Sequence, residues 1–441
     1  MSAELITILM FVGIILGVST GFPVAFVLGG LGVIFGLLAG IGVEHLVPIR
    51  AFGVASTYIY ACIPLFVFMG CMMERSGCSE LAFGTLHRWM GKLRGGLAIG
   101  TVLICTLFAA TTGIVGASVT TMGLVALPAM LKRGYNKPLA TGCVCAGGTL
   151  GILIPPSIML VLYAPMAGVS IARMFMGAIL PGLLLSALFI LYIGIRSYIN
   201  PSMGPPLADE ERERFTRRQN FIMGAKSLFP PLFLILAVLG SIFFGIAAPT
   251  EAAGVGALGS IVLAVIYGKF NRQNLKEASY NTLKISTMII FLALGASLFI
   301  GTLITAGGGP VITNFTLGLG LGRWGTFALI LFIIFMLGMF IDWVGILLIM
   351  VPIFNPILSS LGFDPLWVGL IICISLQMSF LTPPFAYSIF YLKGLHIEGV
   401  TMMDLYRGVV PFVLLQATGT FLCILFPKIV TFLPSLIWAL K

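Results

Sequence analysis

Two stretches of the chain repeat one pattern of small, hydroxylated and helix-breaking residues. In the first, segment 113–118 reads Gly-Ile-Val-Gly-Ala-Ser and segment 154–156 reads Ile-Pro-Pro. In the second, segment 338–342 reads Gly-Met-Phe-Ile-Asp and segment 382–384 reads Thr-Pro-Pro. Matching positions differ by a constant, since 356 − 128, 362 − 134 and 383 − 155 are all 228. Paired, broken hydrophobic segments of this kind point to a carrier with a ligand site at the repeat interface.

The first copy offers oxygen atoms where a membrane helix should unwind. Glycines at 147, 148 and 151 precede Pro155 and Pro156. Proline removes a backbone donor and glycine tolerates unusual φ angles, so backbone carbonyls are freed there. With the hydroxyls of Thr149 and Ser157, they are the ligands that hard cations prefer. A simple proline kink is the alternative.

The residues before each unwound segment are also polar or small. Segment 111–121 contains the hydroxyls of Thr111, Thr112 and Ser118 around Gly116. Half-helix ends there would expose amides and carbonyls to an ion or an anion. Close packing of membrane helices uses the same small residues and is the alternative. The second copy repeats the hydroxyl pattern at 375–384, with Thr382 before the prolines.

Asp342 is the only acidic or basic residue between Arg323 and Asp364. An ionisable group inside a membrane is costly and is functional by default. An aspartate also caps a helix N-terminus, and the two roles are compatible. Glu251 is interpreted as a cap at the start of a span.

The composition sets the class of protein. The chain has 441 residues, of which 59% are hydrophobic and 9% charged, with a mean hydropathy of +1.14. These values predict an all-α polytopic membrane protein without a sizeable soluble domain. The net charge of +10 is scattered over loops, which suits the positive-inside rule and not a nucleic-acid surface. Eight cysteines and three separated histidines make no catalytic or metal cluster, so no enzyme is expected.

Apolar runs of suitable length predict twelve spans. The short segments 114–131 and 343–360 are each predicted to be a re-entrant hairpin of two half-helices. Segments 74–94 and 307–324 are predicted to be amphipathic connectors. Six spans per half leave the orientation of the two repeats open. The predicted spans are 5–20, 23–43, 54–73, 95–110, 138–167, 173–198, 229–247, 252–267, 285–305, 325–341, 366–392 and 408–440.

Four of these segments together resemble a known family. They are Gly-Gly-Thr-Leu-Gly-Ile-Leu-Ile-Pro-Pro-Ser at 147–157, Pro-Thr-Glu-Ala at 249–252, segment 338–342 and Leu-Thr-Pro-Pro at 381–384. They are similar to the large membrane subunit of tripartite ATP-independent periplasmic (TRAP) transporters, in the same order and over essentially the whole chain. The lack of a P-loop motif agrees with transport that does not use ATP.

The resemblance implies an inverted-repeat elevator carrier of the ion-transporter superfamily in a bacterial or archaeal inner membrane. It implies sodium ions as coupling ions and no organic cofactor. Its partners would be a small four-helix membrane subunit, encoded separately, and a periplasmic binding protein that delivers a small organic anion such as a carboxylate or sulfonate. A self-sufficient ion-coupled organic-anion carrier that needs no binding protein is the alternative.

The resemblance also assigns site residues. The chain departs from the usual residues of the family at two places. Gly116-Ala117-Ser118 stands where the family often has consecutive serines, and Trp343 stands where the family usually has a proline. The expected sodium ligands are Ser118, Gly148, Thr149, Ile154, Gly338, Ser379 and Thr382. The expected substrate-binding residues are Thr112, Gly116, Ser118, Pro155, Ser157, Asp342, Pro383 and Pro384.

The same pattern suggests how the chain divides. Segments 111–167 and 325–395 would form the transport domain, each with one hairpin and one unwound helix. The other parts are scaffold helices and interfacial arms at 1–110 and 229–324, a span with the polar inter-repeat loop at 168–228, and a C-terminal scaffold helix at 396–441.

Overall fold

The computed structural model describes residues 2–113, 115–206, 217–384 and 386–438. Every regular element within these residues is a helix. Eight of the described helices are long and apolar enough to cross a membrane, and five shorter apolar helices accompany them. The predicted all-α, multi-pass membrane architecture is confirmed.

The helices follow one another with short connections, and their bounds are as follows. They are α1 (Ala3–Ser19), α2 (Val24–Leu38), α3 (Val43–Ala55), η1 (Tyr58–Ala61), α4 (Cys62–Arg75), α5 (Cys78–Met90), α6 (Gly96–Thr112), α7 (Val115–Lys132), α8 (Lys137–Thr149), η2 (Leu150–Ile152), α9 (Ile158–Met166), α10 (Ile171–Ile199), η3 (Pro201–Met203), α12 (Arg217–Phe243), α13 (Pro249–Ile266), α14 (Arg272–Thr305), α15 (Gly308–Gly318), α16 (Gly322–Gly338), α17 (Trp343–Ser360), α18 (Pro365–Ser379), α19 (Tyr387–Lys393), α20 (Met402–Leu425) and α21 (Lys428–Trp438).

The sequence repeat is also a structural repeat. Helices α7 and α17 start at 115 and 343 and end at 132 and 360, so both ends differ by 228. Helices α8 and α18 start at 137 and 365, again 228 apart. Each repeat has one cis proline pair, Pro155-Pro156 and Pro383-Pro384.

The prediction of a two-part hairpin inside each of the segments 114–131 and 343–360 is wrong. Each described part is a single continuous helix, α7 or α17. The chain reverses just before it. Gly113 ends α6 with a left-handed φ of 59°, and Asp342 begins α17 as its N-cap. The helical hairpins are therefore the pairs α6–α7 and α16–α17. The prediction failed because a helix tolerates small residues such as Gly116, whereas a glycine in the left-handed conformation, such as Gly113, ends a helix.

Both predicted unwound spans are interrupted. The first has its break between η2 and α9, at residues 153–157. The helix continues past the glycines at 147, 148 and 151, where unwinding was expected, because a 3₁₀ turn keeps 150–152 helical. The second has its break between Ser379, which ends α18, and Tyr387, which begins α19. The last predicted span, 408–440, is likewise divided into α20 and α21.

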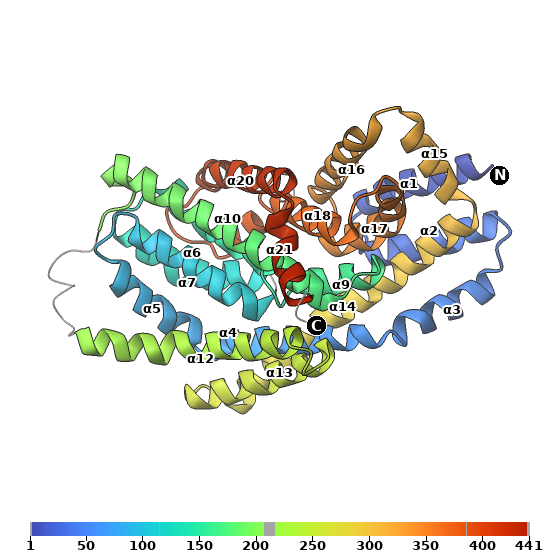
Figure 1. Ribbon diagram of the computed structural model, residues 1–441. Coiled ribbons are helices and arrows are strands. Elements are labelled where there is room, and N and C mark those ends of the chain that lie inside the picture. Colours follow the sequence, from blue (N-terminus) through green and yellow to red (C-terminus); the bar gives the residue numbers. More distant parts are fainter. Residues whose placement is uncertain (1, 114, 207–216, 385, 439–441) are drawn as a thin grey trace.

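The two hairpins lie on opposite sides of the centre of the molecule, with α6–α7 on the left of Figure 1 and α16–α17 on the right. A lower layer contains α12, α13, α4 and α14, of which α13 and α14 both pack on α4. Helix α14 also packs against α2, α3 and α17. Helix α3 was not among the predicted spans. The long α14 thus connects the lower layer to the second hairpin.

Several basic segments meet at one end of the molecule. The amide of Gly95 donates to the carbonyl of Gly204 at 2.8 Å, and the amide of Asn136 donates to the carbonyl of Met203 at 3.1 Å. These bonds join the start of α6, the α7–α8 turn with Lys132 and Lys137, and the segment after α10. The positive-inside rule assigns such an end to the cytoplasm.

Equivalent residues of the two repeats touch in the buried centre. Gln377 of α18 donates from Nε2 to Oγ1 of Thr149 at 3.2 Å, and the two positions are 228 residues apart. Gln416 of α20 donates to the same oxygen at 3.1 Å. The Thr149 hydroxyl donates in turn to the carbonyl of Ala146 at 2.7 Å. The side chains of Thr149, Gln377 and Gln416 are all fully buried. The two hydrogen bonds to the Thr149 hydroxyl connect α8 to α18 and to α20.

We expect Thr149→Val to destabilise the protein. It leaves two buried amide groups without an acceptor, and each unpaired buried group costs about 2 kcal/mol. The midpoint of thermal unfolding in detergent should fall clearly below that of the wild type. Thr101→Val is the matched control, because Thr101 is fully buried but bonds only to Leu97 of its own helix. An equal effect of both variants would contradict the prediction.

Candidate transport site

A cavity of about 140 Å³ lies where the two hairpin tips meet the two broken helices. Both repeats contribute to it, and α14 forms its outer wall. The first repeat supplies Gly113, Val115, Gly116, Ile152 and Ile158; the second supplies Asp342, Trp343, Val344, Phe380, Tyr387 and Tyr391; α14 supplies Ile285, Met288 and Ile289.

Glycines let the first hairpin tip approach its neighbours closely. A Cβ on Gly113 would lie 3.6 Å from the carbonyl oxygen of Pro156, so the tip sits directly on the first helix break. A Cβ on Gly116 would lie 2.8 Å from Cζ of Tyr391, so this glycine accepts the tyrosine ring of the other repeat. The tip therefore contacts the broken helices of both repeats.

Asp342 gives the cavity its charge. It is half-buried, and its Oδ2 accepts a hydrogen bond from the amide of Val344 at 3.2 Å, which caps α17. Among the residues that line the cavity it is the only charged one. Helices α7 and α17 both begin at this cavity. Helix N-termini attract anions.

The expected sodium ligands of the first repeat are not gathered at the cavity. The hydroxyl of Thr149 already has three partners, and Gly148 is covered by Val119 of α7. Ile154 is buried and does not line the cavity. Ser118 is buried beside a separate narrow space that Glu74 also lines.

The expected sodium ligands of the second repeat do lie together. Gly338 at the end of α16 packs against the side chain of Ser379 at the end of α18. Ser379 donates to the carbonyl of Leu376 at 2.6 Å, and Thr382 donates to that of Met378 at 2.9 Å. A hydroxyl that gives its proton to a carbonyl keeps its lone pairs for a cation. Ser157 in the first repeat has the same arrangement, since it donates to the carbonyl of Ile152.

The expected substrate-binding residues divide into two groups. Gly116 and Asp342 line the cavity. The others do not line it: Pro155, Ser157 and Ser118 are buried, Pro383 and Pro384 are exposed, and the side chain of Thr112 lies outside the described residues.

Several residues that line the cavity were not predicted from the sequence. Tyr387 and Tyr391 follow the second proline pair and are four residues apart, so they share one face of the short helix α19. That spacing of two tyrosines after a break was an available signal. The isoleucines of α14 offered none, since they look like any other residues of an apolar span.

Comparison with known proteins identifies the family. A family model described as "Tripartite ATP-independent periplasmic transporter, DctM component" matches residues 7–429. The chain belongs to this family. The large subunits of TRAP transporters are permeases, so this chain is a multi-pass inner-membrane transport protein and not an enzyme.

Named relatives differ in what they transport. The C4-dicarboxylate TRAP transporter large permease protein DctM of Pseudomonas aeruginosa is 31% identical over 393 residues, covering 89% of this chain and 88% of that protein. The ectoine/5-hydroxyectoine TRAP transporter large permease protein UehC of Ruegeria pomeroyi is 32% identical, with 85% of each chain covered. The permease also resembles the isethionate TRAP transporter permease protein DctMQ of Oleidesulfovibrio alaskensis, at 30% identity over 90% of this chain and 61% of that protein.

A solved structure shares the fold. The YdaH transporter of Alcanivorax borkumensis superposes with a TM-score of 0.64 at 15% identity, covering 95% of the permease and 97% of that chain. This similarity supports the architecture of the permease.

We expect Gly116→Ala to impair transport by the permease. The added methyl group would collide with the Tyr391 ring, and one methyl group in a small pocket changes the apparent KM by about tenfold. Uptake of labelled substrate by proteoliposomes measures this. Gly84→Ala, with no atom near the new Cβ, is the control, and Gly116→Ala/Tyr391→Leu should recover uptake. Wild-type kinetics in Gly116→Ala would contradict the assignment of the cavity.

Proposed function

We propose that the chain is the transport subunit of a sodium-driven importer of a small organic anion. The observation that carries this proposal is the cavity that both hairpin tips and both helix breaks enclose. A volume of about 140 Å³ favours a small substrate. The named relatives transport C4-dicarboxylates, ectoines and isethionate, which are all small and polar.

The charge of the cavity supports coupling to a cation. Its lining residues include the carboxylate of Asp342 and no lysine, arginine or histidine. A substrate anion therefore meets a like charge there, which opposes binding. Sodium ions beside Ser379 and Thr382, together with the N-terminus of α7, would offset that repulsion. The loaded ion would thus be a condition for holding the anion.

Transport would follow an elevator mechanism. The hairpins α6–α7 and α16–α17 and the broken helices that follow them would move as one body past α4 and α14, so the body would begin at α6 and not at residue 111. The hydrogen bond of Thr149 to Gln377 favours such a unit, because it ties the two repeats together inside it. The bond of Gln416 to the same hydroxyl would make α20, which was expected to be a scaffold helix, part of the moving body. Sodium would stabilise the conformation that binds substrate, and the loaded unit would then cross.

Two partners complete the proposed system. A periplasmic binding protein would deliver the substrate, and a small four-helix membrane subunit would pack against the scaffold. Exposed apolar side chains on α12 and α13, such as Phe233 and Leu258, leave a surface that lipid or such a subunit can cover.

Reconstitution tests the proposal. Proteoliposomes with the permease, alone or with both partners, would be given a labelled C4-dicarboxylate, ectoine or isethionate under an inward sodium gradient. We expect uptake of one of them only with all partners and only with external sodium. Robust uptake by the chain alone would favour a self-sufficient carrier, and uptake indifferent to sodium would contradict the coupling.

A variant of Thr382 tests the sodium site. Thr382→Val removes one oxygen, and losing one interaction with an ion costs about 1.5 kcal/mol, so half-saturating sodium should rise about tenfold. Thr418→Val is the matched control, because Thr418 makes the same bond, to Leu414 four residues earlier, on an exposed face of α20. An unchanged sodium requirement in Thr382→Val would remove this residue from the site.

A further inference from the structure

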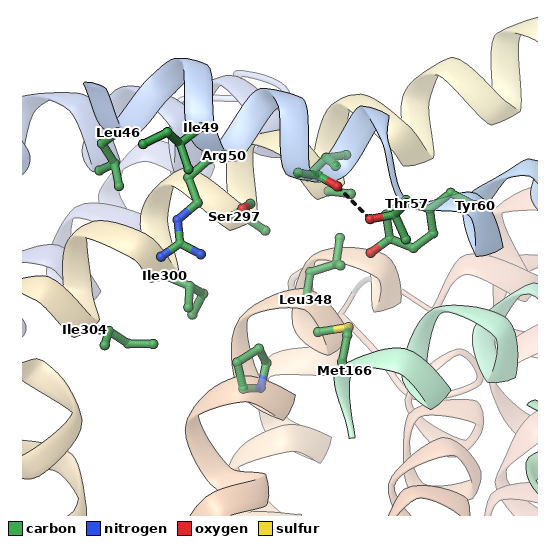
Figure 2. Close-up of a pocket in the computed structure, with 15 residues that line it drawn as sticks. Leu46, Ile49, Arg50, Thr57, Tyr60, Met166, Ser297, Ile300, Ile304 and Leu348 are labelled. Carbon is green, nitrogen blue, oxygen red and sulfur yellow. Dashed lines mark hydrogen bonds between the residues drawn. The ribbon is translucent and has the colours of Figure 1, made fainter. Parts of the chain in front are cut away.

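A second, larger cavity of about 630 Å³ lies between the lower layer and the second hairpin. Helices α3 and α14 and the η1 turn form one side, and α17 with the end of α9 forms the other (Figure 2). Nothing in the proposed function uses this space. It is lined by Leu46, Ile49, Arg50, Gly53, Val54, Thr57, Tyr60, Met166, Ala293, Ala296, Ser297, Ile300, Ile304, Leu348 and Pro352.

Arg50 is the only charged residue in this lining. Its half-buried side chain extends from α3 into the cavity toward α14 (Figure 2). A Cβ on Gly301 would lie 2.7 Å from Nε and 3.2 Å from an Nη of Arg50, so the missing side chain at 301 makes room for the guanidinium. Arg50 has no hydrogen-bond or ion-pair partner among the described residues. An unpaired arginine among membrane helices is costly, which marks a functional position.

The chemistry around Arg50 suits an anion. A guanidinium presents a planar fork of donors that matches a carboxylate, a sulfonate or a phosphate. Ser297 of α14 lies one helical turn before Gly301, and Tyr60 adds a second hydroxyl to the lining. The Thr57 hydroxyl cannot donate to an anion in this arrangement, because it donates to the carbonyl of Gly53 at 2.6 Å. The lining contains no carboxylate that would compete for the arginine.

The two cavities follow one another along the same helix faces. On α14, Ile285 and Ile289 line the small cavity, and Ala293 and Ser297 line the large one at successive steps of four residues. On α17, Val344 lines the small cavity and Leu348, four residues later, lines the large one. Residues four apart share a helix face, so the two cavities lie one after the other along the contact between α14 and α17.

The order of the two cavities across the membrane follows from the charges at the start of α14. Helix α14 begins next to Lys269 and contains Arg272, Lys276 and Lys284 in its first half, and the positive-inside rule places such a segment in the cytoplasm. The large cavity lies farther along α14, at residues 293–304, than the small cavity at 285–289. The Arg50 cavity is thus on the periplasmic side of the small one.

We propose that the Arg50 cavity is a staging site for the anionic group of the transported substrate. Arg50 would hold a carboxylate or sulfonate on the periplasmic side before the substrate reaches the small cavity beside Asp342. This assignment rests on the proposed import function. The positive charge of Arg50 lies in the large, outer cavity, and the negative charge of Asp342 lies in the small, inner cavity. Movement of the anion into the inner cavity therefore depends on sodium, whereas its binding to Arg50 does not.

Charged thiol reagents test the site without knowledge of the substrate. Ser297→Cys places one thiol beside Arg50, and the eight native cysteines are all buried. The purified variant, in nanodiscs of phosphatidylcholine, would be labelled with methanethiosulfonates bearing either a sulfonate or a trimethylammonium group. We expect the sulfonate reagent to react faster, and Arg50→Gln to lower the sulfonate-to-ammonium rate ratio about tenfold.

Three further variants sharpen the result. Arg407→Gln removes an exposed arginine of α20 that does not line either cavity, and should leave the ratio unchanged. Gly301→Ala displaces the guanidinium and should lower the ratio although the charge remains. Arg50→Lys keeps a charge without the fork and should keep most of the preference. A ratio that is equal in Arg50→Gln and the parent would overturn the proposal.

Two more arms separate a substrate site from a lipid site. Succinate or isethionate in the buffer should slow labelling with either reagent. If only phosphatidylglycerol in the nanodisc slows it, Arg50 holds a lipid headgroup and the staging role is wrong. In the reconstituted three-component system, Arg50→Gln should raise the apparent KM about fivefold with a maximal rate near that of the wild type. Sodium-independent uptake by the wild type would instead contradict the proposed sodium coupling, and it would not change the conclusion drawn from the labelling rates.

Discussion

One buried hydroxyl joins the parts on which the site depends. Thr149 accepts hydrogen bonds from Gln377 and Gln416 and donates to Ala146, so α8, α18 and α20 are fixed at one point. Thr149 and Gln377 occupy equivalent positions of the two repeats, so the bond between them joins the repeats at matching places. Because α18 leads directly into one helix break and α8 leads into the other through η2, that bond also helps to set how far apart the breaks lie. The hairpin tips can meet in one small cavity only if this separation is kept.

The charges of the two cavities then order the proposed steps. Arg50 attracts an anion in the outer cavity, where the described residues offer it no acidic partner. Asp342 opposes the same anion in the inner cavity, where only helix N-termini and bound cations can compensate. An empty or sodium-free inner cavity is thus a poor site for an anion. This difference in sign gives a physical reason for coupling that needs no contact between sodium and the substrate.

The sequence predicted the repeat, the helix breaks and the membrane class because these depend on local residue types. Glycine and proline interrupt helices wherever they cluster, and the offset of 228 appears in both the sequence and the helix bounds. The hairpins were misplaced because segment 114–131 looks broken from its small residues, while the true reversal depends on the left-handed Gly113. Arg50 and Tyr391 were missed because their importance comes from the distant segments they meet, Gly301 and Gly116. Such contacts between segments leave no local signal.

The central claim, that the two repeats move as one unit past the scaffold, can be tested by locking one contact. Oγ1 of Thr121 on α7 donates to Oε1 of Glu74 on α4 at 3.2 Å, across the proposed boundary. Glu74→Cys/Thr121→Cys would be joined in the reconstituted system by a short bis-methanethiosulfonate, which forms a reducible disulfide with each thiol and releases methanesulfinate. The account predicts that uptake falls below about a tenth of the uncross-linked rate and returns on reduction, with each single variant unaffected by the reagent. Full uptake by the cross-linked protein would contradict it.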